Sequence, residues 1–189
     1  MAGPVTDQPQ SHGTSFLSMG AAAQHLWGEH ALSGVASGLK AETRRVMLQE
    51  PLVAMAWYPS WMLTDWCNAV WNGPARQRDA VYATFVHRTI DLGWSRVRRM
   101  FVRMLTPGLL AARAAQEWRN EHSHGTVETA LNARGATATF LDGPFVDDPL
   151  MQRGLAECFR YLASLSRVRV VRESHRVEPK KLVVDLVWR

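Results

Sequence analysis

The sequence contains few cysteines and no long apolar run. Its two cysteines, Cys67 and Cys158, lie far apart and form neither a CxxC motif nor a zinc-binding pattern. They are predicted to be small core residues of a protein in a reducing compartment. No stretch of about 18 apolar residues occurs, so no membrane-spanning helix is expected. The first residues lack the charged and apolar regions of a secretory signal, and the cytoplasm is the expected location.

Motifs of the common enzyme classes are also missing. The chain has no GxSxG elbow, no GxGxxG loop and no GxxxxGK[ST] phosphate cradle. His122 and His124 are two residues apart, but no cysteine or carboxylate at matching spacing completes a metal site. The adjacent Asp147 and Asp148 precede Pro149, which is typical of a helix cap. We therefore predict a protein that is not an enzyme and has no metal and no cofactor.

The composition is that of a globular domain. Hydrophobic residues make up 47% of the 189 residues and charged residues 21%, and the formal net charge is +5. Residues 1–20 are rich in Pro, Gly, Ser and Gln, which predicts a disordered leader. Residues 21–189 are then expected to form a single α+β domain, with a helical part over 21–125.

Helical spacing of apolar residues recurs through that first part. Helices are expected over 39–49, 61–71, 76–91 and 94–105, with a further one beginning at Pro107. Ser60 and Thr106 stand at cap positions of two of them. Pro51 and the Asn72-Gly73-Pro74 run are expected to end helices.

The apolar period changes to two beyond Gly125. Strands are predicted over 126–132 and 136–141, joined by a loop at Ala133-Arg134-Gly135, and over 167–173 and 181–188. Between the two pairs, a helix is predicted to begin at Asp148 or Pro149. Residues 126–189 thus form a β-β-α-β-β unit with a four-stranded antiparallel sheet.

Tryptophan is the most conspicuous residue type. One short segment holds an aromatic cluster consisting of Trp57, Tyr58, Trp61, Trp66 and Trp71. Tryptophan is common in cores, in ligand pockets and in protein interfaces. The cluster therefore predicts either a core seam or a surface that binds a small apolar ligand or a protein partner.

Four arginines suggest an alternative function. Helical spacing would align most of a set made of Arg96, Arg98, Arg99 and Arg103. Such an arginine stripe can contact phosphates, but it carries no stacking aromatics and no helix-turn-helix signature. It indicates either a solvated helix face or, as an alternative function, binding to nucleic acid or a phosphate surface.

The order of several short motifs resembles a family of domains. Trp57-Tyr58-Pro59, Thr106-Pro107 and Val187-Trp188 occur along Gly34–Arg189 in the order of a myxobacterial and deltaproteobacterial family of unknown function. That bacterial family is similar in layout to the four-vinyl-reductase and haem-NO-binding domains. The resemblance implies their fold and a sensing or scaffolding role.

The functional residues of those domains are not matched. A haem signature Tyr-x-Ser-x-Arg begun at Tyr161 meets Ala163 and Leu165, and Arg176–Lys181 contains no cysteine. The resemblance therefore implies neither haem nor a metal. Together these observations predict a regulatory or scaffolding module that binds a small apolar ligand or a protein partner and forms a homodimer.

Overall fold

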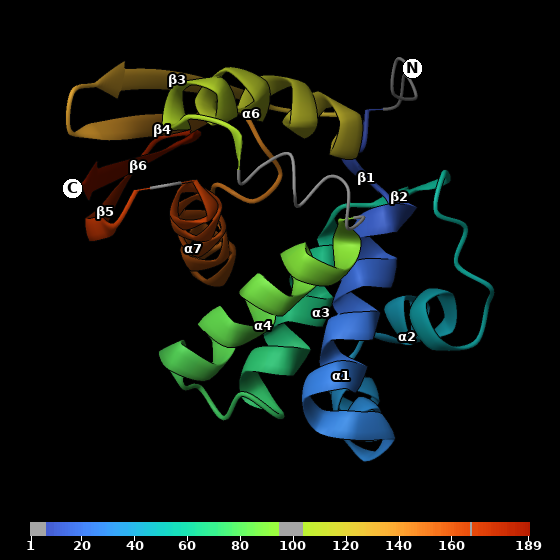
Figure 1. Ribbon diagram of the computed structural model, residues 1–189. Coiled ribbons are helices and arrows are strands. Elements are labelled where there is room, and N and C mark those ends of the chain that lie inside the picture. Colours follow the sequence, from blue (N-terminus) through green and yellow to red (C-terminus); the bar gives the residue numbers. More distant parts are fainter. Residues whose placement is uncertain (1–6, 95–103, 167) are drawn as a thin grey trace. The chain divides into compact units, whose positions relative to one another are not determined.

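Figure 1 shows a computed structural model that describes residues 7–94, 104–166 and 168–189. The chain divides after Gly93 into two compact units. The N-terminal unit holds β1 (Gln10–His12), α1 (Gly13–Gly38), α2 (Ala41–Leu48), β2 (Trp57–Pro59), α3 (Trp61–Asn72) and α4 (Asp79–Gly93). The C-terminal unit holds α6 (Pro107–Glu121), β3 (Thr126–Asn132), β4 (Gly135–Leu141), α7 (Pro149–Leu165), β5 (Val170–Glu178) and β6 (Lys181–Trp188).

Helix α1 organises the N-terminal unit by packing against α2, α3 and α4. Its path bends at Gly28, whose φ of 74° lies in the left-handed region that glycine tolerates. Phe16 of α1, Trp66 of α3 and Phe85 of α4 are almost fully buried. These large side chains form the core of this unit.

The predicted disordered leader is wrong from residue 10 onward. Gln10–His12 form β1, and α1 begins at Gly13 instead of being a pair of uncertain segments after residue 20. Phe16 and Met19 share a helix face, and both side chains lie in the core. Burial of these apolar groups outweighs a local composition that is typical of loops. Residues 1–6 lie outside the described part of the chain.

Strand β1 is held by β2, nearly fifty residues later in the chain. The two strands pair antiparallel, with Gln10 opposite Pro59 and His12 opposite Trp57. The predicted cap at Ser60 is replaced by a tertiary contact, since its side chain makes no capping bond to α3. The Ser60 and Ser11 hydroxyls instead share a buried hydrogen bond of 2.7 Å.

The C-terminal unit contains a four-stranded antiparallel sheet in the order β3-β4-β6-β5. Helix α6 packs against β3, where the Thr129 hydroxyl donates a 2.9 Å hydrogen bond to the carbonyl of Ala111. Helix α7 packs against β5 and β6. Because α6 belongs with the sheet, the predicted division at residue 125 lies some thirty residues after the boundary between the units.

The predicted α+β class, with helices first and a β-β-α-β-β unit last, is confirmed. The first of the two closing strands is longer and later than predicted, because β5 extends to Glu178 in register with β6. Within the described ranges, no helix has both the length and the hydropathy that crossing a membrane requires.

Asp148 caps α7 as its position predicts. Its carboxylate accepts hydrogen bonds of 2.9 Å from the backbone N–H groups of Leu150 and Met151. Asp148→Ala is expected to lower the free energy of unfolding by about 1 kcal/mol, since two helix-terminal donors lose their acceptor. Urea denaturation followed by circular dichroism measures the loss. Asp147→Ala is the matched control, and an equal loss in both variants would contradict the capping role.

Candidate functional site

The aromatic cluster of the sequence lies on β2 and α3. Trp66 is fully buried, whereas the other four side chains are partly exposed. The Trp66 indole N–H finds no acceptor within the described residues. Trp66 is therefore a core residue.

The remaining members of the cluster have separate partners. Trp57 packs edge-on against His12, with ring centroids 4.9 Å apart. Trp71 packs in the same way against Tyr82 at 5.6 Å. The ammonium of Lys40 lies 5.0 Å from the ring centroid of Trp61. The Tyr58 hydroxyl accepts a 3.0 Å hydrogen bond from the backbone of Val53. These contacts are distinct, and a ligand role for the cluster stays a prediction.

The arginine stripe lies outside the described residues. Arg96, Arg98, Arg99 and Arg103 all fall in the segment between Trp94 and Met104. Binding to nucleic acid or a phosphate surface through them stays a prediction.

His122 and His124 lie at the end of α6, and each has a structural role. The His122 ring contacts Trp118 and Phe145, with centroid distances of 4.3 and 5.3 Å. Burial lowers the pKa of His122 to about 3, so its ring is neutral at physiological pH. The His124 carbonyl accepts a 3.0 Å hydrogen bond from the Trp118 indole. In the described part of the chain, no three metal-binding side chains gather at one place.

The cysteines are poorly suited to nucleophilic chemistry. Cys67 is buried within α3. Burial, together with the negative charge of Glu157, raises the pKa of the Cys158 thiol to about 12. Because the thiolate is the reactive form, little of Cys158 is in that form near neutral pH.

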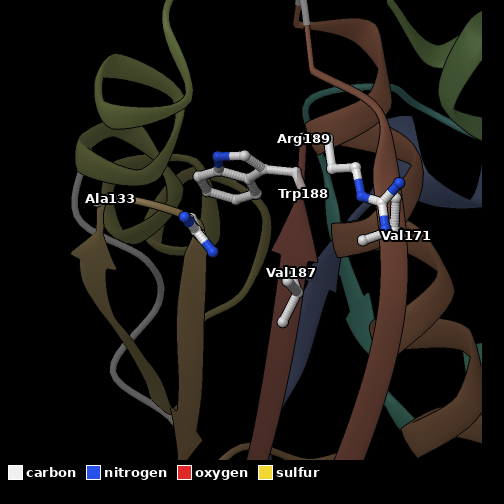
Figure 2. Close-up of a pocket in the computed structure, with 6 residues that line it drawn as sticks. Ala133, Val171, Val187, Trp188 and Arg189 are labelled. Atoms are coloured by element: carbon white, nitrogen blue, oxygen red, sulfur yellow. The ribbon is translucent and has the colours of Figure 1, made fainter.

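A groove opens at one end of the four-stranded sheet, where β3 turns into β4 and β6 ends. This sheet-end groove has a volume of about 570 Å³ and is lined by Ala133, Arg134, Val171, Val187, Trp188 and Arg189. In Figure 2 the Trp188 indole points toward Ala133, whereas the Arg189 side chain extends toward Val171. Apolar surface and two guanidinium groups thus line the same hollow.

Backbone hydrogen bonds hold the walls of the groove in place. The Trp188 N–H donates to the Arg134 carbonyl at 2.9 Å, which ties β6 to the β3–β4 loop. Arg189 and Arg169 exchange two backbone hydrogen bonds of 3.0 and 3.1 Å. Between these points a bulge at Val171 interrupts the regular β5–β6 register and leaves this side chain 45% exposed. The groove therefore lies on strand ends that are joined by backbone hydrogen bonds.

Two basic side chains line the groove. Arg134 and Arg189 are both exposed and line it, and none of its described lining residues is acidic. An arginine can bind a carboxylate, sulfonate or phosphate through two parallel hydrogen bonds. The geometry can accommodate a ligand with an apolar body and an anionic group.

Sequence reasoning missed this groove. The loop at Ala133–Gly135 and the strand that ends at Trp188 were both expected, but only their pairing across the sheet brings them together. The bulge at Val171 has no local signal in the sequence. Two arginines close to strand ends were the one available indication, and it is a weak one.

Comparisons with known proteins reveal the fold of the chain but no close relative. No protein-family model and no curated protein matches the sequence. An H-NOX protein from S. oneidensis in the Fe(II) ligation state matches with a TM-score of 0.66 at 10% identity, covering 94% of this chain and 96% of that one. An oxygen-binding H-NOX domain related to soluble guanylate cyclases matches with a TM-score of 0.62 at 8% identity, covering 94% and 92%.

A third structure agrees with these two. The Fe(II) unliganded H-NOX protein from K. algicida has a TM-score of 0.61 at 10% identity and covers 94% of this chain and 96% of that one. The similarity in layout to haem-NO-binding domains is confirmed, while membership of the myxobacterial family stays a prediction. Over 94% of its length, this chain has the fold of H-NOX domains.

Proposed function

We propose that this protein is a non-enzymatic regulatory module whose sheet-end groove binds a small molecule with an apolar body and an anionic group. The observation that carries the proposal is the groove itself, which combines Val171, Val187 and Trp188 with two arginines. Its volume of about 570 Å³ lies in the range typical of small-molecule sites. The similarity to H-NOX domains, one of which is described as oxygen-binding, supports a ligand-binding role.

The haem signature Tyr-x-Ser-x-Arg is not found in this chain. The three tyrosines are Tyr58, Tyr82 and Tyr161, and the residues four positions after them are Met62, Val86 and Leu165. No tyrosine is therefore followed by the arginine of a Tyr-x-Ser-x-Arg signature. At the signature begun at Tyr161, Ala163 and Leu165 lie on α7 and offer no side-chain hydrogen-bond donor. The proposed function accordingly does not rely on haem.

A pair of dyes tests the proposal. Anilinonaphthalene sulfonate has an apolar aromatic body and one anionic group, and N-phenylnaphthylamine has the same body without the charge. We expect the native protein to bind the sulfonate more tightly. Arg134→Gln and Arg189→Gln should each weaken sulfonate binding about tenfold, the loss of one charge-assisted hydrogen-bond pair. Fluorescence titration measures both dyes.

Two controls separate groove binding from general dye adhesion. Arg113→Gln changes an exposed arginine of α6 outside the groove lining and should leave both affinities unchanged. Trp188→Ala should weaken both dyes, because it removes apolar contact surface. Sulfonate affinity that is unaffected by both groove arginine variants would refute the proposed site.

A further inference from the structure

Strand β5 forms an open edge of the four-stranded sheet. It is nine residues long and pairs with β6 on one side only, among the described residues. Most of its side chains are exposed, including Val177 at 50%. Edge strands with free backbone groups can pair with a strand of another chain.

The hydrogen-bond alternation identifies which backbone groups point outward. Arg169 and Arg189 exchange both of their hydrogen bonds, and Trp188 donates to Arg134 on the other side of β6. Bonding alternates along an antiparallel strand, so every second residue of β6, counted back from Arg189, bonds to β5. The β5 residues opposite them, which point their backbone groups toward β6, are Arg172, Ser174, Arg176 and Glu178. Beyond the bulge at Val171, the remaining residues are Glu173, His175 and Val177, and they point their N–H and C=O groups away from the sheet.

We infer that β5 pairs antiparallel with β5 of a second copy of this chain, with His175 on the two-fold axis. In this register the outward groups of Glu173 face those of Val177 on the other copy, and His175 faces itself. About six backbone hydrogen bonds form across the joined sheets. Arg172 lies opposite Glu178 on both sides of the axis.

Charge complementarity selects this register. A two-fold axis perpendicular to the sheet sets residues of the same face opposite each other. The axis therefore passes through a residue of β5 and not between two residues. Centring on Glu173 or Arg176 places that residue opposite its own copy, and centring on Ser174 places Arg172 opposite Arg176. Each of these three registers opposes like charges, which destabilises a pair of strands. Centring on Val177 sets Pro179, which lacks an N–H, opposite His175 and leaves most of β5 unpaired.

The His175-centred register pairs Arg172 with Glu178 at both ends of the joined strands, and it sets no two carboxylates and no two guanidinium groups opposite one another. Charged residues on an edge strand usually oppose pairing, but here their order is complementary to itself. Glu178 already contacts Lys181 at 3.1 Å and Arg176 at 3.4 Å within its own chain. Arg172 of the second copy adds to a network of charges instead of making an isolated pair.

A charge exchange tests the register. Arg172→Glu and Glu178→Arg should each weaken the dimer at least about tenfold, because each places like charges opposite one another. The double variant restores opposite charges and should return the dissociation constant to within about threefold of the native value. Analytical ultracentrifugation of the full chain over a wide concentration range measures all four proteins. Circular dichroism melting checks that each variant folds.

A cysteine placed on the axis gives a second readout. In the proposed register the two copies of residue 175 have Cα atoms about 5.5 Å apart, within disulfide range. His175→Cys should yield a disulfide-linked dimer under mild oxidation. Ser174→Cys is the control, since its copies lie opposite residue 176 and beyond that range. A native chain that stays monomeric, a double variant that stays as weak as the single ones, or cross-linking that is equal at both positions would overturn the inference.

Discussion

Replacing Trp66 with alanine is expected to lower the free energy of unfolding of the N-terminal unit by about 3–5 kcal/mol. The indole is fully buried on α3 and lies among the largest enclosed side chains of the unit. Its removal loses the transfer free energy of the ring and leaves a cavity that the neighbouring helices fill only in part. Such a loss is a large fraction of the stability of an ordinary domain.

Trp66→Phe separates the ring from its N–H group. The indole nitrogen has no acceptor within the described residues, so phenylalanine removes a buried donor whose desolvation is uncompensated. It also keeps most of the apolar volume. We expect this variant to lose less than half of the stability that Trp66→Ala loses. Urea denaturation of both variants measures the difference, and equal losses would show that Trp66 is not a packing residue.

The same residue explains why the aromatic cluster was ambiguous in the sequence. Spacing shows which residues share a helix face, but not whether that face is buried. Trp66 and Trp71 are both on α3, yet only Trp66 has a fully buried side chain. The partners that distinguish them, such as Tyr82 of α4 and His12 of β1, lie far away in the sequence.

Helix ends with chemical signals were predictable. Thr106 before Pro107 and Asp148 before Pro149 both accept backbone hydrogen bonds at the positions their types favour. These signals are local, because a cap and the N–H it binds are two or three residues apart. The strands β3, β4 and β6 were predictable for a similar reason, since their alternation is continuous over each strand.

Features that depend on distant pairing were missed. The β1–β2 pair joins Gln10 to Pro59, and neither three-residue strand has a pattern of its own. Strand β5 reaches Glu178 because β6 pairs along its whole length, although its sequence from Ser174 is polar. The sheet-end groove combines three separate segments for the same reason. Sites of this kind become visible only once the pairing of strands is known.

The second large effect that we expect is a dependence of stability on pH through His122. Burial lowers the pKa of this ring to about 3 in the folded protein, whereas a histidine in an unfolded chain has a pKa near 6.5. Between pH 3 and pH 6.5, the unfolded state therefore binds a proton at this ring and the folded state does not. Full stability is present above about pH 6.5 and falls as the pH decreases toward 3.

Between pH 6.5 and pH 3, His122 can lower the free energy of unfolding by at most about 1.4 kcal/mol for each pH unit. The ring is partly exposed beside Trp118 and Phe145, so the measured slope is expected to lie below that limit. His122→Phe keeps an aromatic ring against these neighbours but cannot bind a proton. In this variant the free energy of unfolding should lack the pH dependence that His122 contributes and keep the part that the carboxylates contribute.

Urea denaturation at a series of pH values between 4 and 7 measures this contribution as the difference between the native protein and His122→Phe. His25→Phe is the matched control, because it makes the same substitution at an exposed position of α1. Equal slopes in the native protein and His122→Phe would mean that the ring is protonated in the folded state. The packing of His122 against Trp118 and Phe145 would then have to tolerate a charge, and burial at the end of α6 would not lower the pKa of this ring.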